Sequence, residues 1–304
     1  MLVFTDHVLE TFYPEFREAN HFGHYIGRLG VLLFFVHTSR VLMSSMDRIG
    51  SAKAFYIRRI FRIYPLAIFT ILLIVAFQIP QVPWKGYAQL GWVDLTSNFL
   101  LTQNLTSTPS VVGPMWSLPL EVQMYAFLPL IFFMRRYIWP IFGLSVLGAI
   151  FIAPLSDVFS VFRFAPCFVA GVIAYTSDLR SLPAWGWFAF LAAVVCVYVG
   201  VEMVTPGIHH VSLQIATTLA VGLAIPCFQQ SRAWKFNRVT NLLAKYSYGI
   251  YLFHCIALWI APNLILAVVF TAVMSVASFH LIENPMIKWG GRVASWKPMM
   301  ETVK

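Results

Sequence analysis

The sequence predicts an all-α protein, a polytopic membrane bundle of about ten transmembrane helices that form a single domain over residues 1–304. The composition is 59% hydrophobic and 11% charged, whereas about 25% of the residues in a soluble domain are charged. Long apolar runs recur along the chain, and basic residues concentrate in every second connector between them. A soluble protein of this length could not bury so much apolar surface, so we expect repeated membrane crossings.

The apolar runs give the expected helices in order. The first run is too short to cross a hydrocarbon core of about 30 Å alone, so we expect a truncated span there. Between the runs lie a polar loop (14–28), a basic connector (47–62), a long loop rich in Pro and Gly (80–115) and a second basic connector (229–245). No internal repeat or low-complexity tract is evident. The expected spans are about 2–13, 29–46, 63–79, 116–134, 137–152, 162–176, 185–202, 211–228, 246–260 and 264–282.

Charge asymmetry predicts the orientation of the bundle. Alternate connectors and the C-terminal tail hold 16 of the 21 basic residues. By the positive-inside rule these connectors and the C-terminus are cytoplasmic. The net charge of +9 therefore reflects topology, and we expect no nucleic-acid partner. The residues are Arg48, Lys53, Arg58, Arg59, Arg62, Arg135, Arg136, Arg180, Arg232, Lys235, Arg238, Lys245, Lys288, Arg292, Lys297 and Lys304.

The cysteines predict neither disulfides nor a metal site. Cys167, Cys196, Cys227 and Cys255 all fall in apolar runs, and none has the spacing of metal ligands. We therefore expect no bound metal and no permanently bound cofactor. No basic leader precedes the first apolar residues, so we also expect no cleavable signal peptide.

The segment Trp116–Tyr125 places a carboxylate, Glu121, inside a predicted span. A charge at membrane depth costs at least about 2.5–3.5 kcal/mol, so it faces a partner or a polar cavity. Ser117, Glu121 and Tyr125 share one helical face at i, i+4 spacing, and Ser117 is positioned to cap the helix. One interpretation is a structural carboxylate paired with an arginine of another helix; the other, which we favour, is a functional group.

His7 and Arg40 are two further polar residues expected at membrane depth. At 1.5 Å per residue, His7 lies about 10 Å and Glu121 about 5 Å below the outer membrane face, so the two could meet in one cavity. A carboxylate beside a histidine fixes its tautomer and supports its action as a general base. Packing between helices is an equally simple interpretation of His7, and Arg40 could form a structural pair with Glu121 or Asp6.

Arg58, Arg59 and Arg62 cluster on the opposite, cytoplasmic side. Arg59 and Arg62 share a helical face at i, i+3 spacing, and planar guanidinium groups suit phosphate oxygens. From charge alone, residues that only set membrane topology would look the same.

Five motifs follow one another along the chain: Gly27–Val36 with the pattern G-x-x-G-V-x-x-F-F-V, Phe55–Pro65 with F-Y-x-R-R-x-x-R-x-x-P, Trp116–Tyr125 with W-S-L-x-x-E-x-x-x-Y, Tyr248–His254 with Y-G-I-Y-L-x-H, and Glu283–Pro285 with E-x-P. Each motif is weak alone, but their order and spacing cover almost the whole chain. Together they resemble the acyltransferase 3 family of bacterial integral membrane acyltransferases.

This resemblance implies an enzyme that moves an acyl group, commonly acetyl, from cytoplasmic acyl-CoA to a hydroxyl of an envelope or exported polysaccharide or glycolipid, in the bacterial inner membrane. His7 would match the family's essential histidine, Glu121 its motif carboxylate, and Arg59 and Arg62 its R-x-x-R pair, with Arg58 beside them at the CoA phosphates. Substrate contacts would come from residues along the path between the two sites, namely Arg40, Trp116, Ser117, Tyr125 and His254.

Two positions depart from the family pattern. The family has an arginine eleven positions before its first-helix histidine, which here would precede Met1, so about half of that helix is expected to be missing. The family's S-G-F is replaced by Thr38-Ser39-Arg40.

Two other functions remain open at this point. One is a transporter or flippase for a lipid-linked sugar that uses the same cavity without chemistry, although the paired repeats typical of transporters are not found. The other is a non-catalytic membrane partner of an enzyme.

Overall fold

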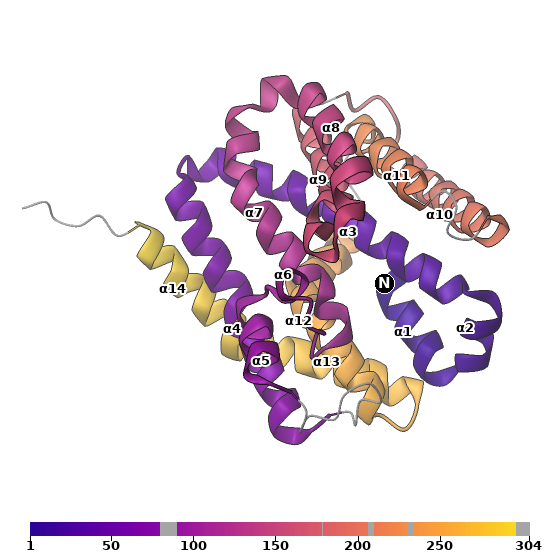
Figure 1. Cartoon of the computed structure of the whole chain (residues 1–304), viewed down its shortest axis with the longest axis vertical. Helices are drawn as coiled ribbons and strands as arrows, with labels where there is room; N and C mark the ends of the chain where they lie inside the picture. The colour runs from indigo at the N-terminus through magenta and orange to yellow at the C-terminus, as the bar shows by residue number, and fades with distance from the viewer. Residues whose placement is uncertain (80–89, 178, 206–209, 230–233, 296–304) are drawn as a thin grey trace, which may run out of the picture.

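The computed structural model describes residues 1–79, 90–177, 179–205, 210–229 and 234–295, which form helices and no extended strand (Figure 1). Eight helical segments within this part of the chain are long and apolar enough to cross a membrane: Phe22–Ile49, Ala52–Phe77, Gly113–Phe133, Arg135–Leu155, Asp157–Thr176, Gly186–Val204, His210–Cys227 and Leu264–Ser295. The predicted all-α membrane bundle is therefore confirmed. The other two expected spans correspond to α1 (Leu2–Phe12), which is roughly 16 Å long, and to the second half of α12 (Trp234–Ile260).

Glycines set the closest helix crossings. A Cβ at Gly171 on α9 (Ser160–Thr176) would lie 2.1 Å from the carbonyl oxygen of Val36 on α3 (Phe22–Ile49). A Cβ at Gly222 on α11 (His210–Ala224) would lie 2.4 Å from the carbonyl oxygen of Ala170. Lipid provides no hydrophobic force between helices, so small residues that allow close backbone approach are what hold such crossings. These contacts make α3, α9 and α11 one packed unit.

The expected polar loop at residues 14–28 is wrong. It forms α2 (Pro14–Asn20) and the first turns of α3. The structural reason is that α1 packs against this part of α3: a Cβ at Gly27 would lie 2.3 Å from an Asp6 carboxylate oxygen, and one at Gly30 would lie 2.9 Å from Val3. The polar residues that resemble a loop in the sequence thus line a contact between helices.

The basic connector at 47–62 is also mostly helical. Gly50 ends α3 in the left-handed region (φ 66°), and the Ser51 side chain caps the next helix, α4 (Ala52–Phe77). Arg58, Arg59 and Arg62 therefore lie on regular helix, not in a loop. Helix α14 (Asn284–Ser295) runs beside this end of α4 (Figure 1), where a Cβ at Gly290 would lie 2.5 Å from Phe61.

The described part of the long loop between α4 and α7 (Ser117–Phe133) carries two short helices, α5 (Trp92–Leu100) and α6 (Gln103–Thr106). The fully buried Asn98 organises it: its amide nitrogen donates to the carbonyl of Pro109 (3.0 Å), and its amide oxygen accepts from the backbone of Val111 (2.9 Å). Ser117 does not cap α7, because a 3-10 turn precedes it and its hydroxyl instead bonds that of Tyr251 at 2.7 Å. The rest of the bundle consists of α8 (Ile138–Leu147), α10 (Gly186–Val204) and α13 (Leu264–Ser278).

The α3–α9 crossing yields a first prediction. Gly171→Leu should destabilise the purified protein by at least about 1–3 kcal/mol, because the new side chain has no space against the backbone of α3. The measurement is the thermal midpoint of unfolding in detergent. Gly143→Leu on α8 is the matched control, since a Cβ there meets no neighbouring atom within 4 Å. Equal midpoints for the two variants would contradict this account of the crossing.

Candidate functional site

A cavity of about 1120 Å³ opens between α1, α3, α9 and the loop that follows α5. Charged groups from α1 and α2 form one wall, while Arg28 of α3 and Arg163 of α9 contribute to another. Arg28 falls in the expected polar loop at 14–28, but both arginines lie on helices that are long and apolar enough to cross a membrane. Trp116 also lines the cavity and packs against Phe164, with ring centroids 5.7 Å apart. The cavity is large enough for a sugar-sized molecule and offers it both aromatic and charged surfaces.

His7 lies in the wall of this cavity with its side chain 20% exposed. Its Nδ1 atom is 2.8 Å from a carboxylate oxygen of Glu10, one turn further along α1. An ionised carboxylate only accepts hydrogen bonds, so in the neutral imidazole Nδ1 is the nitrogen that carries the proton and Nε2 is the one with the lone pair. This arrangement is what a general base needs: one nitrogen is held by an acid and the other is free to take a proton.

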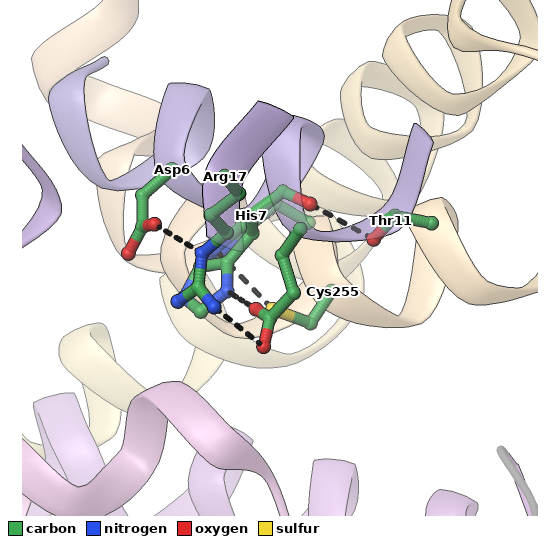
Figure 2. A network of polar contacts seen from close by, with 7 residues as sticks. Asp6, His7, Thr11, Arg17 and Cys255 are labelled. Carbon is green, nitrogen blue, oxygen red and sulfur yellow. Dashed lines mark hydrogen bonds and ion pairs between the residues drawn. The ribbon is translucent and has the colours of Figure 1, made fainter. Parts of the chain in front are cut away.

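Arg17 ties the acids of α1 together. It reaches back from α2, with Nε 3.0 Å from Asp6 and Nη1 3.7 Å from Glu10 (Figure 2). The buried Asp6 carboxylate is thereby paired, and Glu10 is held between Arg17 and His7. The sequence gives little indication of this network beyond the i, i+3 spacing of His7 and Glu10, because Arg17 lies in what resembles a loop.

His254 and Cys255 of α12 lie against His7. The His7 and His254 ring centroids are 5.2 Å apart, and Cys255 Sγ is 3.5 Å from His254 Nε2. The His254 Nδ1 donates to the carbonyl oxygens of Tyr251 (2.8 Å) and Ile250 (3.1 Å). Both His254 and Cys255 are 2% exposed, so they form a layer behind His7 and do not line the cavity. The motif identifies His254 from sequence, but nothing there indicates a role for Cys255.

The expected meeting of His7 and Glu121 is not formed. Glu121 is buried on α7 and is not among the residues that line the cavity. Its carboxylate accepts a hydrogen bond from Tyr125, and the positive charges acting on it are those of Arg59 and Arg62 on α4. The expectation that Ser117, Glu121 and Tyr125 share a face is confirmed, since all three are buried. Glu121 and Tyr125 lie near the arginines, whereas Ser117 bonds Tyr251, and Glu10 is the acid beside His7.

The three arginines of α4 point in different directions. Arg58 is exposed, while Arg59 and Arg62 are half-buried. Arg62 Nη1 lies 3.3 Å from the fully buried carboxylate of Glu283, which belongs to the E-x-P motif. Arg59 lies over the Phe55 ring at 5.8 Å, and its buried Nε has no hydrogen-bond partner in the described part of the chain. Arg59 and Arg62 thus offset the negative charges of the buried acids Glu121 and Glu283, in addition to any role in setting the membrane topology.

Arg40 pairs with neither of its expected partners. Asp6 bonds Arg17 and Glu121 bonds Tyr125, while the buried Arg40 Nε has no hydrogen-bond partner among the described residues. A cationic group without a partner inside an apolar bundle is costly. Arg40 therefore stays a candidate for contact with a substrate.

Comparison with known proteins gives a consistent picture. A family model described as an acyltransferase domain matches residues 1–285. The acyltransferase MdmB of Streptomyces mycarofaciens is 23% identical over 88% of this chain and 82% of its own length. A provisionally named peptidoglycan O-acetyltransferase, YrhL, of Bacillus subtilis (strain 168) is 23% identical over 97% of this chain, which spans 55% of YrhL. A provisionally named acetyltransferase, ORF330, of Acidianus two-tailed virus is 24% identical over 75% of this chain and 72% of its own length. No solved structure matches the chain.

The Arg62–Glu283 pair yields a second prediction. Arg62→Ala should lower the free energy of unfolding by about 3–5 kcal/mol, because it leaves a buried carboxylate without its cation. The double variant Arg62→Met/Glu283→Gln should recover most of the loss. Arg58→Ala, on the exposed side of the same helix, should change stability by less than about 0.5 kcal/mol. Thermal midpoints in detergent measure all three, and an unaltered midpoint in Arg62→Ala would show that the pair is not structural.

Proposed function

We propose a function from the family of this chain, which belongs to the acyltransferase family whose domain model matches residues 1–285. The protein transfers an acyl group, represented here by acetyl, from acyl-CoA to a hydroxyl of an envelope or exported polysaccharide or glycolipid. The single observation that supports this most directly is the orientation of His7. His7 lines a cavity of about 1120 Å³, and its Nδ1 is held by Glu10, which leaves Nε2 as the nitrogen that can take a proton. We expect the acceptor to enter that cavity with its hydroxyl directed at Nε2.

The proposed reaction requires one proton relay by His7. Nε2 takes the proton of the acceptor hydroxyl as the hydroxyl oxygen attacks the thioester carbonyl. The imidazolium, stabilised by Glu10, then returns the proton to the departing sulfur. The products are an ester on the acceptor and the free thiol of CoA, so atoms and charge balance.

Arg58, Arg59 and Arg62 form the proposed donor-binding end. The unpartnered Nε of Arg59 and the exposed Arg58 are available for the phosphates of CoA. In this proposal Glu121 does not act on His7. It is a positioning residue whose negative charge holds Arg59 at the end of the bundle, and Tyr125 fixes its carboxylate.

The acyl arm of the donor would thread from this end toward His7. Arg40, with its unpartnered Nε, is the proposed polar contact along the way. Ser117 and Tyr125 are buried on α7 and would line the path from that helix, while Trp116 is available to the acceptor in the cavity. His254 packs against His7 from outside the cavity. Its proposed role is therefore to hold the His7 ring in position and not to contact the substrate directly.

The chain is a multi-pass membrane protein, and we propose that it resides in the bacterial inner membrane with the Arg59 end in the cytoplasm. Positive charge at that end supports this orientation. The donor would then bind where CoA is made, and the acceptor would reach His7 from the outer side.

His7→Ala should lower acyl transfer by about 10²–10⁴-fold, the usual contribution of a general base. Glu10→Gln should cause a smaller loss, because the imidazole keeps its lone pair but loses the acid that orients it. The assay follows labelled acetyl from acetyl-CoA into glycan in membrane vesicles. Glu18→Gln on the exposed face of α2 is the matched control. Normal transfer by His7→Ala would remove the proposed base.

Arg59→Ala should raise the KM for acetyl-CoA more than it lowers kcat, since it removes a contact to the donor's phosphates. Arg58→Ala should have a smaller effect because its side chain is exposed. An unchanged KM in Arg59→Ala would exclude a role of the arginines in donor binding. They would then only set the membrane topology and neutralise buried acids. If instead the protein moves lipid-linked sugar without acyl-CoA and no label is transferred, the flippase alternative replaces this proposal.

A further inference from the structure

Three metal-binding side chains meet behind the wall of the cavity: His7 of α1, and His254 and Cys255 of α12. One ligand atom from each lies within 4.8 Å of the others. Figure 2 shows Cys255 on the side of His7 away from Asp6. The cysteine spacing in the sequence predicts no metal site, because the ligands come from helices about 250 residues apart in the chain.

Both imidazoles are already oriented as metal ligands are. The Nδ1–H of His7 is held by the Glu10 carboxylate, and that of His254 by two backbone carbonyls. Metal-bound histidines usually donate their other ring N–H to a carboxylate or a carbonyl in this way, which fixes the coordinating nitrogen and makes it more basic. The Nε2 atom of His254 lies 3.5 Å from the Cys255 sulfur, and a ring nitrogen of His7 lies within 4.8 Å of both.

We propose that His7, His254 and Cys255 form a binding site for Zn²⁺ or a similar borderline-soft divalent cation. Two imidazole nitrogens and one thiolate are preferred ligands of zinc, and three protein ligands leave a fourth position open to water. With bonds of about 2.0–2.3 Å, tetrahedral zinc holds its ligand atoms about 3.3–3.6 Å apart. The 3.5 Å between Cys255 Sγ and His254 Nε2 already matches this spacing. His7, the most exposed of the three, needs to shift by roughly one ångström.

Occupation of this site would regulate the enzyme. A metal ion on His7 Nε2 takes the lone pair that the proposed reaction needs for the acceptor's proton, so bound zinc inhibits transfer. This consequence rests on the proposed function, but the metal site itself does not. Zinc reaches the ligands through the cavity, since His7 is the member that lines it.

The test is a Co²⁺ titration of the purified full-length chain in detergent, followed by thiolate-to-cobalt charge-transfer absorption and by competition with Zn²⁺. Removing a residue that only hydrogen-bonds a metal ligand lowers metal affinity by about 10–100-fold. Cys255→Ser removes a ligand itself, so it should weaken cobalt binding by at least about 100-fold and abolish the charge-transfer band. Cys196→Ser, at an exposed cysteine on α10, is the matched control and should keep both. His254→Ala should weaken binding while retaining the thiolate.

Activity provides a second, separate measurement. Zn²⁺ should inhibit acetyl transfer at least tenfold in the parent chain and in Cys196→Ser, and much less in Cys255→Ser. A charge-transfer band that persists in Cys255→Ser, or equal Zn²⁺ affinity in Cys255→Ser and the parent, would overturn the site. If no variant transfers acetyl, the proposed function fails while the cobalt titration still decides the metal site.

Discussion

The ion pair between Asp6 and Arg17 holds α1 in place, and the position of His7 depends on it. Helix α1 is positioned by a buried carboxylate that fits only because Gly27 has no side chain and that Arg17 neutralises at 3.0 Å. Successive residues of a helix differ by about 100° in direction. With Asp6 fixed against α3, the next residue, His7, faces the cavity and α12.

A second group of buried charges organises the opposite end of the bundle. Glu283 is paired with Arg62, and Glu121 lies in the field of Arg59 and is bonded by Tyr125. These contacts connect α4, α7 and the turn before α14. Tyr248 of α12 adds a further tie, since its hydroxyl donates to the carbonyl of Ile63 on α4 at 2.7 Å. Each carboxylate in this apolar interior is thus compensated, as the cost of an isolated buried charge requires.

The same residues therefore serve stability and the proposed chemistry together. Arg59 and Arg62 offset buried acids, and Arg59 also keeps an Nε without a partner. Glu10 offsets Arg17 and also orients the imidazole of His7. Variants at these positions change both folding and activity, so a kinetic effect is interpretable only beside a stability measurement on the same protein. The exposed Arg58 of α4 provides the reference for stability, and the exposed Glu18 of α2 provides it for activity.

The sequence by itself determined the all-α membrane class, most of the spans, and the inward face of Ser117, Glu121 and Tyr125. Hydropathy and helical periodicity are local properties, so a single chain carries them in full. Only the tertiary structure decided that Glu10 and not Glu121 lies beside His7, that residues 14–28 are helical, and that Cys255 joins two histidines. Which charged side chains meet depends on the depth and rotation of whole helices. Those are set by close contacts at Gly27, Gly171 and Gly222, which no local pattern specifies.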